Sequence, residues 1–169
     1  PKALMTEPLR AGYFVWYDPR LLFMSANLFF RSPHMSDFTV QELTLGQLLE
    51  NTAARFPDTD AVIHADRELR QTWSEFSACV DDMARGLMAI GVQKGEKVAV
   101  WATNVPHWVT LMFATARIGA ILVTVNTNYR ETELRYLLQQ SECENLFIID
   151  SVRDHDFIAS TYEVLPELR

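Results

Sequence analysis

A strand, a helix and a second strand follow one another near the middle of the chain, and this order constrains the fold more than any other feature. Residues 97–102 (KVAVWA) predict a strand, the apolar segment 106–119 predicts a helix, and residues 121–125 (ILVTV) predict the next strand. Strands that alternate with helices of this length form right-handed crossovers in a parallel sheet. The sequence therefore predicts a layered α/β fold with a parallel sheet of the doubly wound type.

The residues before this unit predict two capped helices and a small hairpin. Residues 44–47 (TLGQ) and 72–75 (TWSE) have the capping-box spacing of a helix start, and each is followed by apolar residues at helical intervals. Between the two helices, the short segments 61–64 and 68–71 predict the strands of a β-hairpin. The fold should therefore carry a small N-terminal hairpin next to its parallel sheet.

The residues after this unit continue the alternation of helices and strands. Residues 131–140 predict an amphipathic helix, and residues 146–150 (LFIID) predict a third buried strand. Residues 151–169 are expected to be partly helical. The apolar helix at residues 106–119 needs cover on several sides, and we expect the chain either to self-associate, as a homo-oligomer, or to cover this surface with the aromatic residues of its first 34 residues.

Charge and cysteine content narrow the classes of partner and compartment. Residues 1–34 contain four basic and two acidic residues, which leaves 11 basic and 20 acidic residues, a formal charge of −9, in residues 35–169. Such an acidic body argues against nucleic acid as a partner, because phosphate backbones need clustered lysine and arginine. Cys79 and Cys143 are the only cysteines, and two isolated cysteines favour a reducing compartment, the cytoplasm.

Neither a metal site nor a membrane span is predicted. The four histidines have no metal-ligand spacing to one another or to the cysteines. No apolar run approaches the roughly 18 residues that a transmembrane helix requires.

Residues 1–34 differ in character from the rest of the chain. The segment is rich in aromatic residues without a clear period, and four prolines interrupt it. We interpret it as a leader or extension that is not native, because residues 31–35 (RSPHM) resemble a cloning junction. The alternative is a mitochondrial presequence, which would place the protein in the mitochondrial matrix. Residues 35–169 are predicted to form the organised domain.

Five segments resemble the motifs of the acyl-adenylate-forming (AMP-binding) enzymes, and they occur in the family's order. They are residues 69–76 (LRQTWSEF), 86–99 (GLMAIGVQKGEKVA), 104–108 (NVPHW), 114–126 (ATARIGAILVTVN) and 128–134 (NYRETEL). Residues 126–129 (NTNY) resemble the corresponding segment of acyl-CoA synthetases, whereas amino-acid-activating domains more often place proline and aspartate there. The chain as a whole most resembles the medium-chain acyl-CoA synthetases.

This resemblance implies a function for a longer parent enzyme. Such enzymes join a fatty carboxylate to ATP with Mg²⁺, release pyrophosphate, and transfer the acyl group from acyl-AMP to CoA. Residues 35–169 would be the N-terminal, incomplete part of the AMP-binding large domain, with the remainder of the enzyme as partner. Two alternatives stay open: an amino-acid or aryl-acid adenylating domain, and an α/β binding or interaction domain without chemistry.

The later motifs of the family, which hold phosphate, ribose, magnesium and the catalytic lysine, are not in this sequence. The six glycines include no Gly-x-Gly pair, and none follows Gly119, so the chain has no glycine-rich loop to cradle a phosphate. We therefore assign no catalytic, cofactor-binding or metal-binding residue, and predict that the 169-residue chain is inactive by itself.

Four residues are candidates for indirect contacts with a substrate channel. Asn104 follows one predicted strand, and Asn126, Asn128 and Tyr129 follow the next. In parallel sheets, ligands bind beyond the carboxyl ends of the strands. Each asparagine also has a structural alternative: Asn104 could cap the helix that begins at Pro106, and the other two could form turns.

Overall fold

The computed structural model describes residues 42–168, so the predicted leader and its boundary at Met35 lie outside the described residues. The longer elements are α1 (Leu45–Arg55), β1 (Asp60–His64), β2 (Leu69–Thr72), α2 (Trp73–Ala89), β3 (Lys97–Trp101), α3 (Pro106–Ile118), β4 (Ile121–Thr124), α4 (Glu131–Ser141), β5 (Asn145–Ile148) and α5 (Phe157–Val164). The predicted strands and helices are confirmed, with ends that move by one or two residues.

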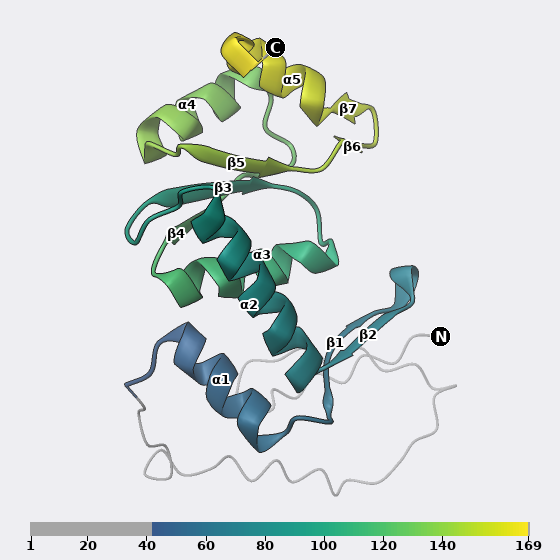
Figure 1. Cartoon of the computed structure of the whole chain (residues 1–169). Coiled ribbons are helices and arrows are strands. Elements are labelled where there is room, and N and C mark those ends of the chain that lie inside the picture. Colours follow the sequence, from purple (N-terminus) through teal and green to yellow (C-terminus); the bar gives the residue numbers. More distant parts are fainter. Residues whose placement is uncertain (1–41, 169) are drawn as a thin grey trace, which may run out of the picture. The chain divides into compact units, whose positions relative to one another are not determined.

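The central sheet has three parallel strands in the order β4-β3-β5. The step from β3 to β4 and the step from β4 to β5 run in opposite directions across the sheet. Crossovers of one hand then place their helices on opposite faces. Figure 1 shows this arrangement, with α1, α2 and α3 on one face and α4 and α5 on the other. The layered, doubly wound architecture is therefore confirmed.

Alternate side chains of β3 enter two separate cores, because successive residues of a strand point to opposite faces. Val98 and Val100 pack in the core beneath α1, α2 and α3. Ala99 and Trp101 pack in the core beneath α4 and α5. This explains why β3 is apolar at nearly every position: both of its faces are covered.

The apolar helix α3 finds its cover within the described residues. Its large apolar side chains are buried or half-buried against α1, α2 and the sheet. The expected need for cover is thus met by α1 and α2, which contact α3 directly. Self-association stays a prediction, and Leu45 and Leu48 of α1 are among the large apolar side chains that are exposed.

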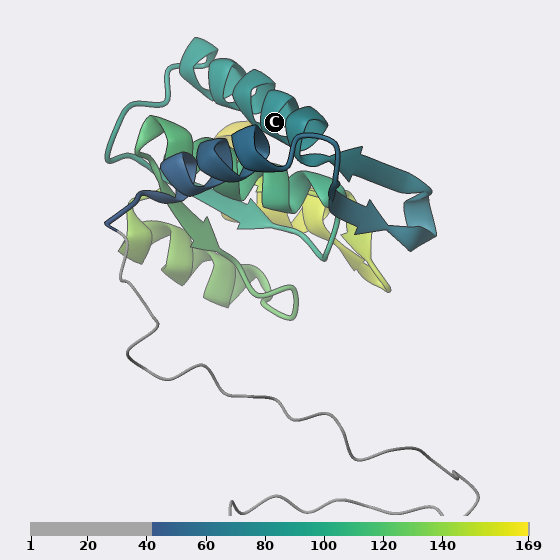
Figure 2. The same cartoon turned by 90° about the horizontal axis from the view of Figure 1, so that it is seen from below.

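The predicted hairpin is formed by the antiparallel strands β1 and β2, which Figure 2 shows extending beside the first turns of α2. A short 3-10 turn, Ala65–Arg67, joins the strands, and Glu68 adopts a left-handed backbone with φ of 52°. Within residues 42–168, every helix is too short or too polar to cross a membrane.

The residues after β5 form more structure than predicted. Two-residue strands β6 (Ser151–Val152) and β7 (His155–Asp156) pair as a tight hairpin before α5, and the 3-10 turn η3 (Pro166–Leu168) follows α5. The partly helical character of this region is confirmed. The hairpin was missed because strands of two residues have no apolar alternation to reveal them.

Both predicted capping boxes are present, and that of α2 provides a test of local stability. The Thr72 hydroxyl accepts from the Glu75 N–H at 3.3 Å, and the Glu75 carboxylate accepts from the Thr72 N–H at 2.8 Å. We expect Thr72→Ala to lower the free energy of unfolding by about 1 kcal/mol, measured by urea denaturation. The control is Ser74→Ala, an exposed position in the same turn, which should change it by less than about 0.5 kcal/mol. Equal losses in the two variants would contradict the capping role.

Candidate site at the carboxyl ends of the sheet

The four predicted site residues lie in the loops that follow β3 and β4. Asn104 is in the loop after β3, and Asn126, Asn128 and Tyr129 are in the loop after β4. Because the two strands are parallel, both loops leave the same edge of the sheet. The structure therefore places all four residues at the edge where α/β sheets bind ligands.

Asn104 does not cap α3, so that prediction was wrong. The N-cap is Val105, which has an extended backbone and makes no side-chain cap bond. Asn104 is one residue too early for this role, and Pro106 starts the helix without needing a partner for an N–H. The backbone carbonyl of Asn104 instead accepts a hydrogen bond from His64 Nε2 at 2.8 Å, which connects the β1–β2 hairpin to this loop.

The loop after β4 is held by a turn of its own and by an indole from β3. Asn126 Oδ1 accepts from the Asn128 N–H at 2.9 Å, so the predicted asparagine turn is confirmed for this pair. The Asn126 carbonyl accepts from the Tyr129 N–H at 3.0 Å and from Trp101 Nε1–H at 3.1 Å. The Tyr129 ring is half-buried against the core beneath α4 and α5.

Three aromatic rings fill the core behind this loop. Trp101 and Phe157 are fully buried and stack with ring centroids 3.8 Å apart and planes 5° apart. His155 lies edge-on to both rings, with centroids 5.3 Å from Trp101 and 4.8 Å from Phe157. Position 155 thus brings a titratable ring to within contact of the indole that holds Asn126.

A chain of polar side chains continues from this aromatic group. His155 Nε2 lies 2.9 Å from Ser160 Oγ, and the Ser160 hydroxyl donates to the carboxylate of Glu131, the first residue of α4. The bond to Ser160 is the main reason that the pKa of Glu131 is lower than its ordinary value, and the Glu131 backbone N–H, His155 and Arg130 act in the same direction. Glu131 is therefore ionised at neutral pH.

The helix starts at this edge do not fit a phosphate group. The first turn of α4 carries Glu131 and Glu133, whose charges repel a phosphate. At α3, Pro106 removes one of the N–H donors that would face an anion. No group of three histidine, cysteine or acidic side chains among residues 42–168 has a metal-binding arrangement. We therefore derive no step of phosphoryl or metal chemistry from these residues.

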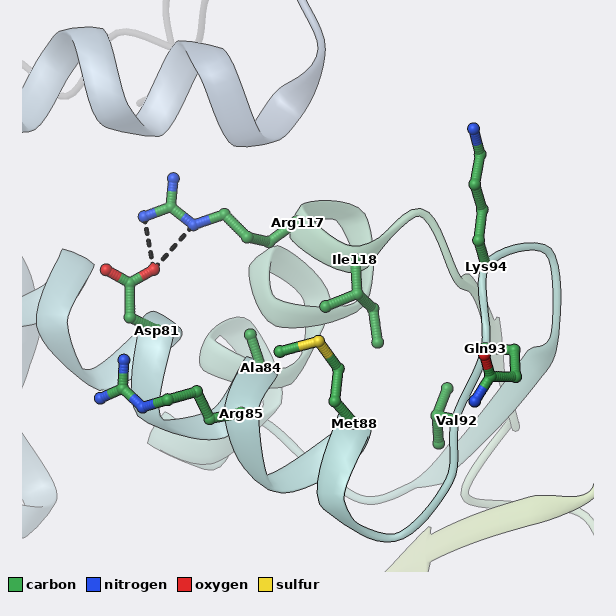
Figure 3. Close-up of a pocket in the computed structure, with 9 residues that line it drawn as sticks. All are labelled: Asp81, Ala84, Arg85, Met88, Val92, Gln93, Lys94, Arg117 and Ile118. Atoms are coloured by element: carbon green, nitrogen blue, oxygen red, sulfur yellow. Dashed lines mark hydrogen bonds and ion pairs between the residues drawn. The ribbon is translucent and has the colours of Figure 1, made fainter.

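Two hollows lie on the surface of the described residues, and one of them begins at this edge. One, of about 550 Å³, is formed by α2, α3 and residues 92–94, which precede β3 and so lie toward its amino end. Figure 3 shows Arg117 paired with Asp81 at one side of it, apolar side chains across the floor, and the Lys94 ammonium pointing away. The second, of about 560 Å³, runs along α4 from Tyr129 to Ser141. Only this second hollow includes a predicted site residue.

Sequence reasoning missed His64, Glu131, His155 and Ser160. These residues belong to four different elements, β1, α4, β7 and α5, and only folding brings them to the edge. No spacing in the sequence marks them as a group. The one available signal was that Glu131 opens a helix directly after the asparagine-rich segment.

The comparisons with known proteins agree with the residues that first suggested a family. The AMP-binding enzyme family matches residues 49–168. YngI of Bacillus subtilis (strain 168), whose name assigns it provisionally to the acyl-CoA synthetases, is 48% identical over 126 residues, 75% of this chain and 23% of YngI. The mitochondrial medium-chain acyl-CoA ligase ACSF2 of Mus musculus is 33% identical over 133 residues, 79% of this chain and 22% of ACSF2. The chain thus spans between a fifth and a quarter of the length of these relatives.

Solved structures give the same architecture. The N-terminal domain of FACL13 from Mycobacterium tuberculosis has a TM-score of 0.64, with 24% identity, over 75% of this chain and 30% of that chain. The N-terminal subdomain of NpsA from Klebsiella oxytoca, in complex with 3-hydroxybenzoyl-AMSN, has a TM-score of 0.60, with 27% identity, over 64% of this chain and 27% of that chain. The fold is therefore that of N-terminal parts of adenylate-forming enzymes.

Proposed function

Since the chain belongs to the family of AMP-binding enzymes, we propose that it is the N-terminal part of an ATP-dependent acyl-CoA synthetase. The parent enzyme activates a fatty carboxylate as acyl-AMP and transfers the acyl group to CoA. The observation that carries this proposal is sequence identity of 48% and 33% to relatives named as an acyl-CoA synthetase and a medium-chain acyl-CoA ligase. The 169-residue chain by itself forms no acyl-AMP.

The role of this part is to shape one wall of the parent's substrate channel. Asn104, Asn126, Asn128 and Tyr129 make contacts there from the carboxyl ends of β3 and β4. Their position at this edge supports the role, and so does the hollow that begins at Tyr129. ATP, Mg²⁺ and CoA bind to the remainder of the parent, where ATP supplies the adenylate that makes the carboxyl group reactive.

A segment exchange tests the proposal. Residues 49–168 replace the matching segment of mouse ACSF2, and in a second chimera the matching segment of YngI. We expect the chimeras to release pyrophosphate and form acyl-CoA from a medium-chain fatty acid, because the chain is 33% identical to ACSF2 and 48% identical to YngI over this region. The 169-residue chain alone should give no ATP–pyrophosphate exchange above the protein-free blank.

Intact ACSF2, and ACSF2 without the segment, are the positive and negative references. Two chimeras that melt cooperatively but stay at the level of the truncated reference would contradict the acyl-CoA synthetase assignment. Exchange that rises with the concentration of the 169-residue chain would contradict its inactivity.

A second candidate function, activation of an aryl or amino acid, is favoured by one observation. The NpsA subdomain, which is bound to a 3-hydroxybenzoyl compound, has a TM-score of 0.60, against 0.61 for a fatty acyl CoA synthetase of Mycobacterium tuberculosis. Running the chimeras with octanoate, benzoate and an amino acid separates the candidates. A non-catalytic binding domain predicts no turnover with any of these acids.

The compartment and the assembly state belong to the same proposal. Cys79 and Cys143 are both free thiols, which supports the reducing cytoplasm. The ACSF2 relatives are named as mitochondrial proteins, so the mitochondrial matrix is the alternative. The matrix is favoured if residues 1–34 act as a mitochondrial presequence. Sedimentation over a range of concentrations measures whether the chain self-associates.

A further inference from the structure

The hydrogen bonds that join His155, Ser160 and Glu131 run in one direction. An ionised Glu131 can only accept, so the one hydroxyl hydrogen of Ser160 is donated to it. Ser160 Oγ then accepts from His155, which requires a hydrogen on Nε2 of the imidazole. The three side chains therefore form a directed sequence of bonds that ends at the first residue of α4.

Both ends of the loop at residues 126–130 are tied to buried groups. At one end, the carbonyl of Asn126 accepts from the buried Trp101 indole at 3.1 Å. At the other end, Glu131 is held by Ser160, which is 5% exposed, and through it by His155, which is 6% exposed. Within the loop, the backbone N–H groups of Asn128 and Tyr129 donate to Asn126, a neighbour in the same turn. The outer supports are thus more buried than the loop that they hold.

We propose that Ser160 and His155 are positioning residues: they fix the loop at residues 126–130 by holding Glu131 at one end, while the Trp101 indole holds the other. His155 connects the two supports, because its ring packs against Trp101 while its Nε2 binds Ser160. The bond between His155 and Ser160 is buried, and buried polar networks rigidify the elements that they join when their groups are paired. The consequence for turnover rests on the proposed function; the positioning itself does not.

Hydrogen exchange on the 169-residue chain tests the positioning. Ser160→Ala removes the hydroxyl that holds Glu131, and we expect the exchange of the Trp101 indole N–H and of the Leu134 amide, which donates to Arg130, to rise about tenfold. The matched control is Thr161→Val on the same helix. The Thr161 hydroxyl is also buried but bonds only to the Phe157 carbonyl within α5. It should change both exchange rates by less than about twofold.

The pH titration of the Glu131 carboxyl group separates this positioning role from a general loosening of α5. The groups that face Glu131 are Arg130 at the end of the loop, His155 on β7 and Ser160 on α5, while Asp156 is occupied in capping α5. The pKa of Glu131 is below its ordinary 4.5 in the folded chain, so its stabilising effect is complete above that value and is lost as pH falls through the lowered pKa. In Ser160→Ala, the Glu131 carboxyl carbon should titrate at higher pH than in the unchanged chain.

Two results would overturn the proposal. One is an equal rise of exchange in Ser160→Ala and Thr161→Val, which would mean that α5 is merely loosened. The other is an unchanged Glu131 titration in Ser160→Ala. Turnover is measured separately, by placing Ser160→Ala in an active chimera, where the KM for the fatty acid should rise more than with Thr161→Val. If Ser160→Ala changes the hydrogen exchange and the Glu131 titration as expected but no chimera is active, the result would count against the proposed function. The positioning role of Ser160 and His155 would still stand.

Discussion

Replacing Trp101 by alanine is expected to lower the free energy of unfolding by about 3–5 kcal/mol, the usual range for removing a buried aromatic side chain. Trp101 is fully buried at the end of the central strand and stacks on Phe157. The substitution leaves a cavity between the sheet and α5, and removes the indole bond to Asn126. In a domain of this size the melting temperature should fall by about 10–20 °C.

The matched variants separate packing from hydrogen bonding at this position. Trp101→Phe keeps a ring against Phe157 but loses the donor, and should cost about 1–2 kcal/mol. Tyr136→Ala, a ring on α4 that is 67% exposed, should cost less than about 0.5 kcal/mol. Calorimetry and urea denaturation measure all three. A Trp101→Ala variant as stable as Tyr136→Ala would show that the ring does not pack as described.

Periodic features of the sequence predicted the fold because each one reports a local environment. The apolar run of β3 indicated a strand covered on both faces, and side chains from its two faces do enter two cores. The two capping boxes predicted helix starts at residues 45 and 73 because their side chains satisfy the first free N–H groups. Such features depend on residues that are close in the sequence, so they can be recognised without knowledge of the tertiary structure.

The parts that were missed depend on contacts between distant segments. Ser160 and Glu131 are 29 residues apart, and His64 and Asn104 are 40 residues apart. Nothing local distinguishes a serine that binds a distant carboxylate from one that faces solvent. The cap of α3 failed for a different reason: Pro106 can start a helix after a residue without a capping side chain, so the favoured asparagine was not needed.

The sequence predicted the location of the candidate site but not the buried side chains that hold its loop. The positions of Asn126, Asn128 and Tyr129 after a strand followed from strand polarity, and the asparagine turn followed from residue type. Their contact with a substrate stays a proposal. The supports from Trp101 and Ser160 could not be predicted, because they require the faces of α4 and α5 to be known first.

Arg117→Ala is expected to produce the second-largest loss of stability, about 2 kcal/mol, because Arg117 joins three helices. Its guanidinium donates to Asp81 at 2.7 and 2.8 Å and to the Ser77 hydroxyl at 3.3 Å on α2. On α1, it donates to the Gly46 carbonyl at 3.5 Å. The side chain is 20% exposed, so these charged bonds are less screened than surface pairs, and each contributes more than a neutral bond.

The chain contains a matched control for this arginine. Arg85 on α2 pairs with Asp82, the residue that follows Asp81. The Arg85 and Asp82 side chains are 66% and 73% exposed. Arg85→Ala should therefore cost less than about 0.5 kcal/mol. Arg117→Lys keeps the charge but loses the planar fork, and should recover less than half of the loss. Urea denaturation at low and high salt measures these variants. Arg117 has the larger role only if its loss exceeds that of Arg85 and persists in high salt, where exposed pairs are screened.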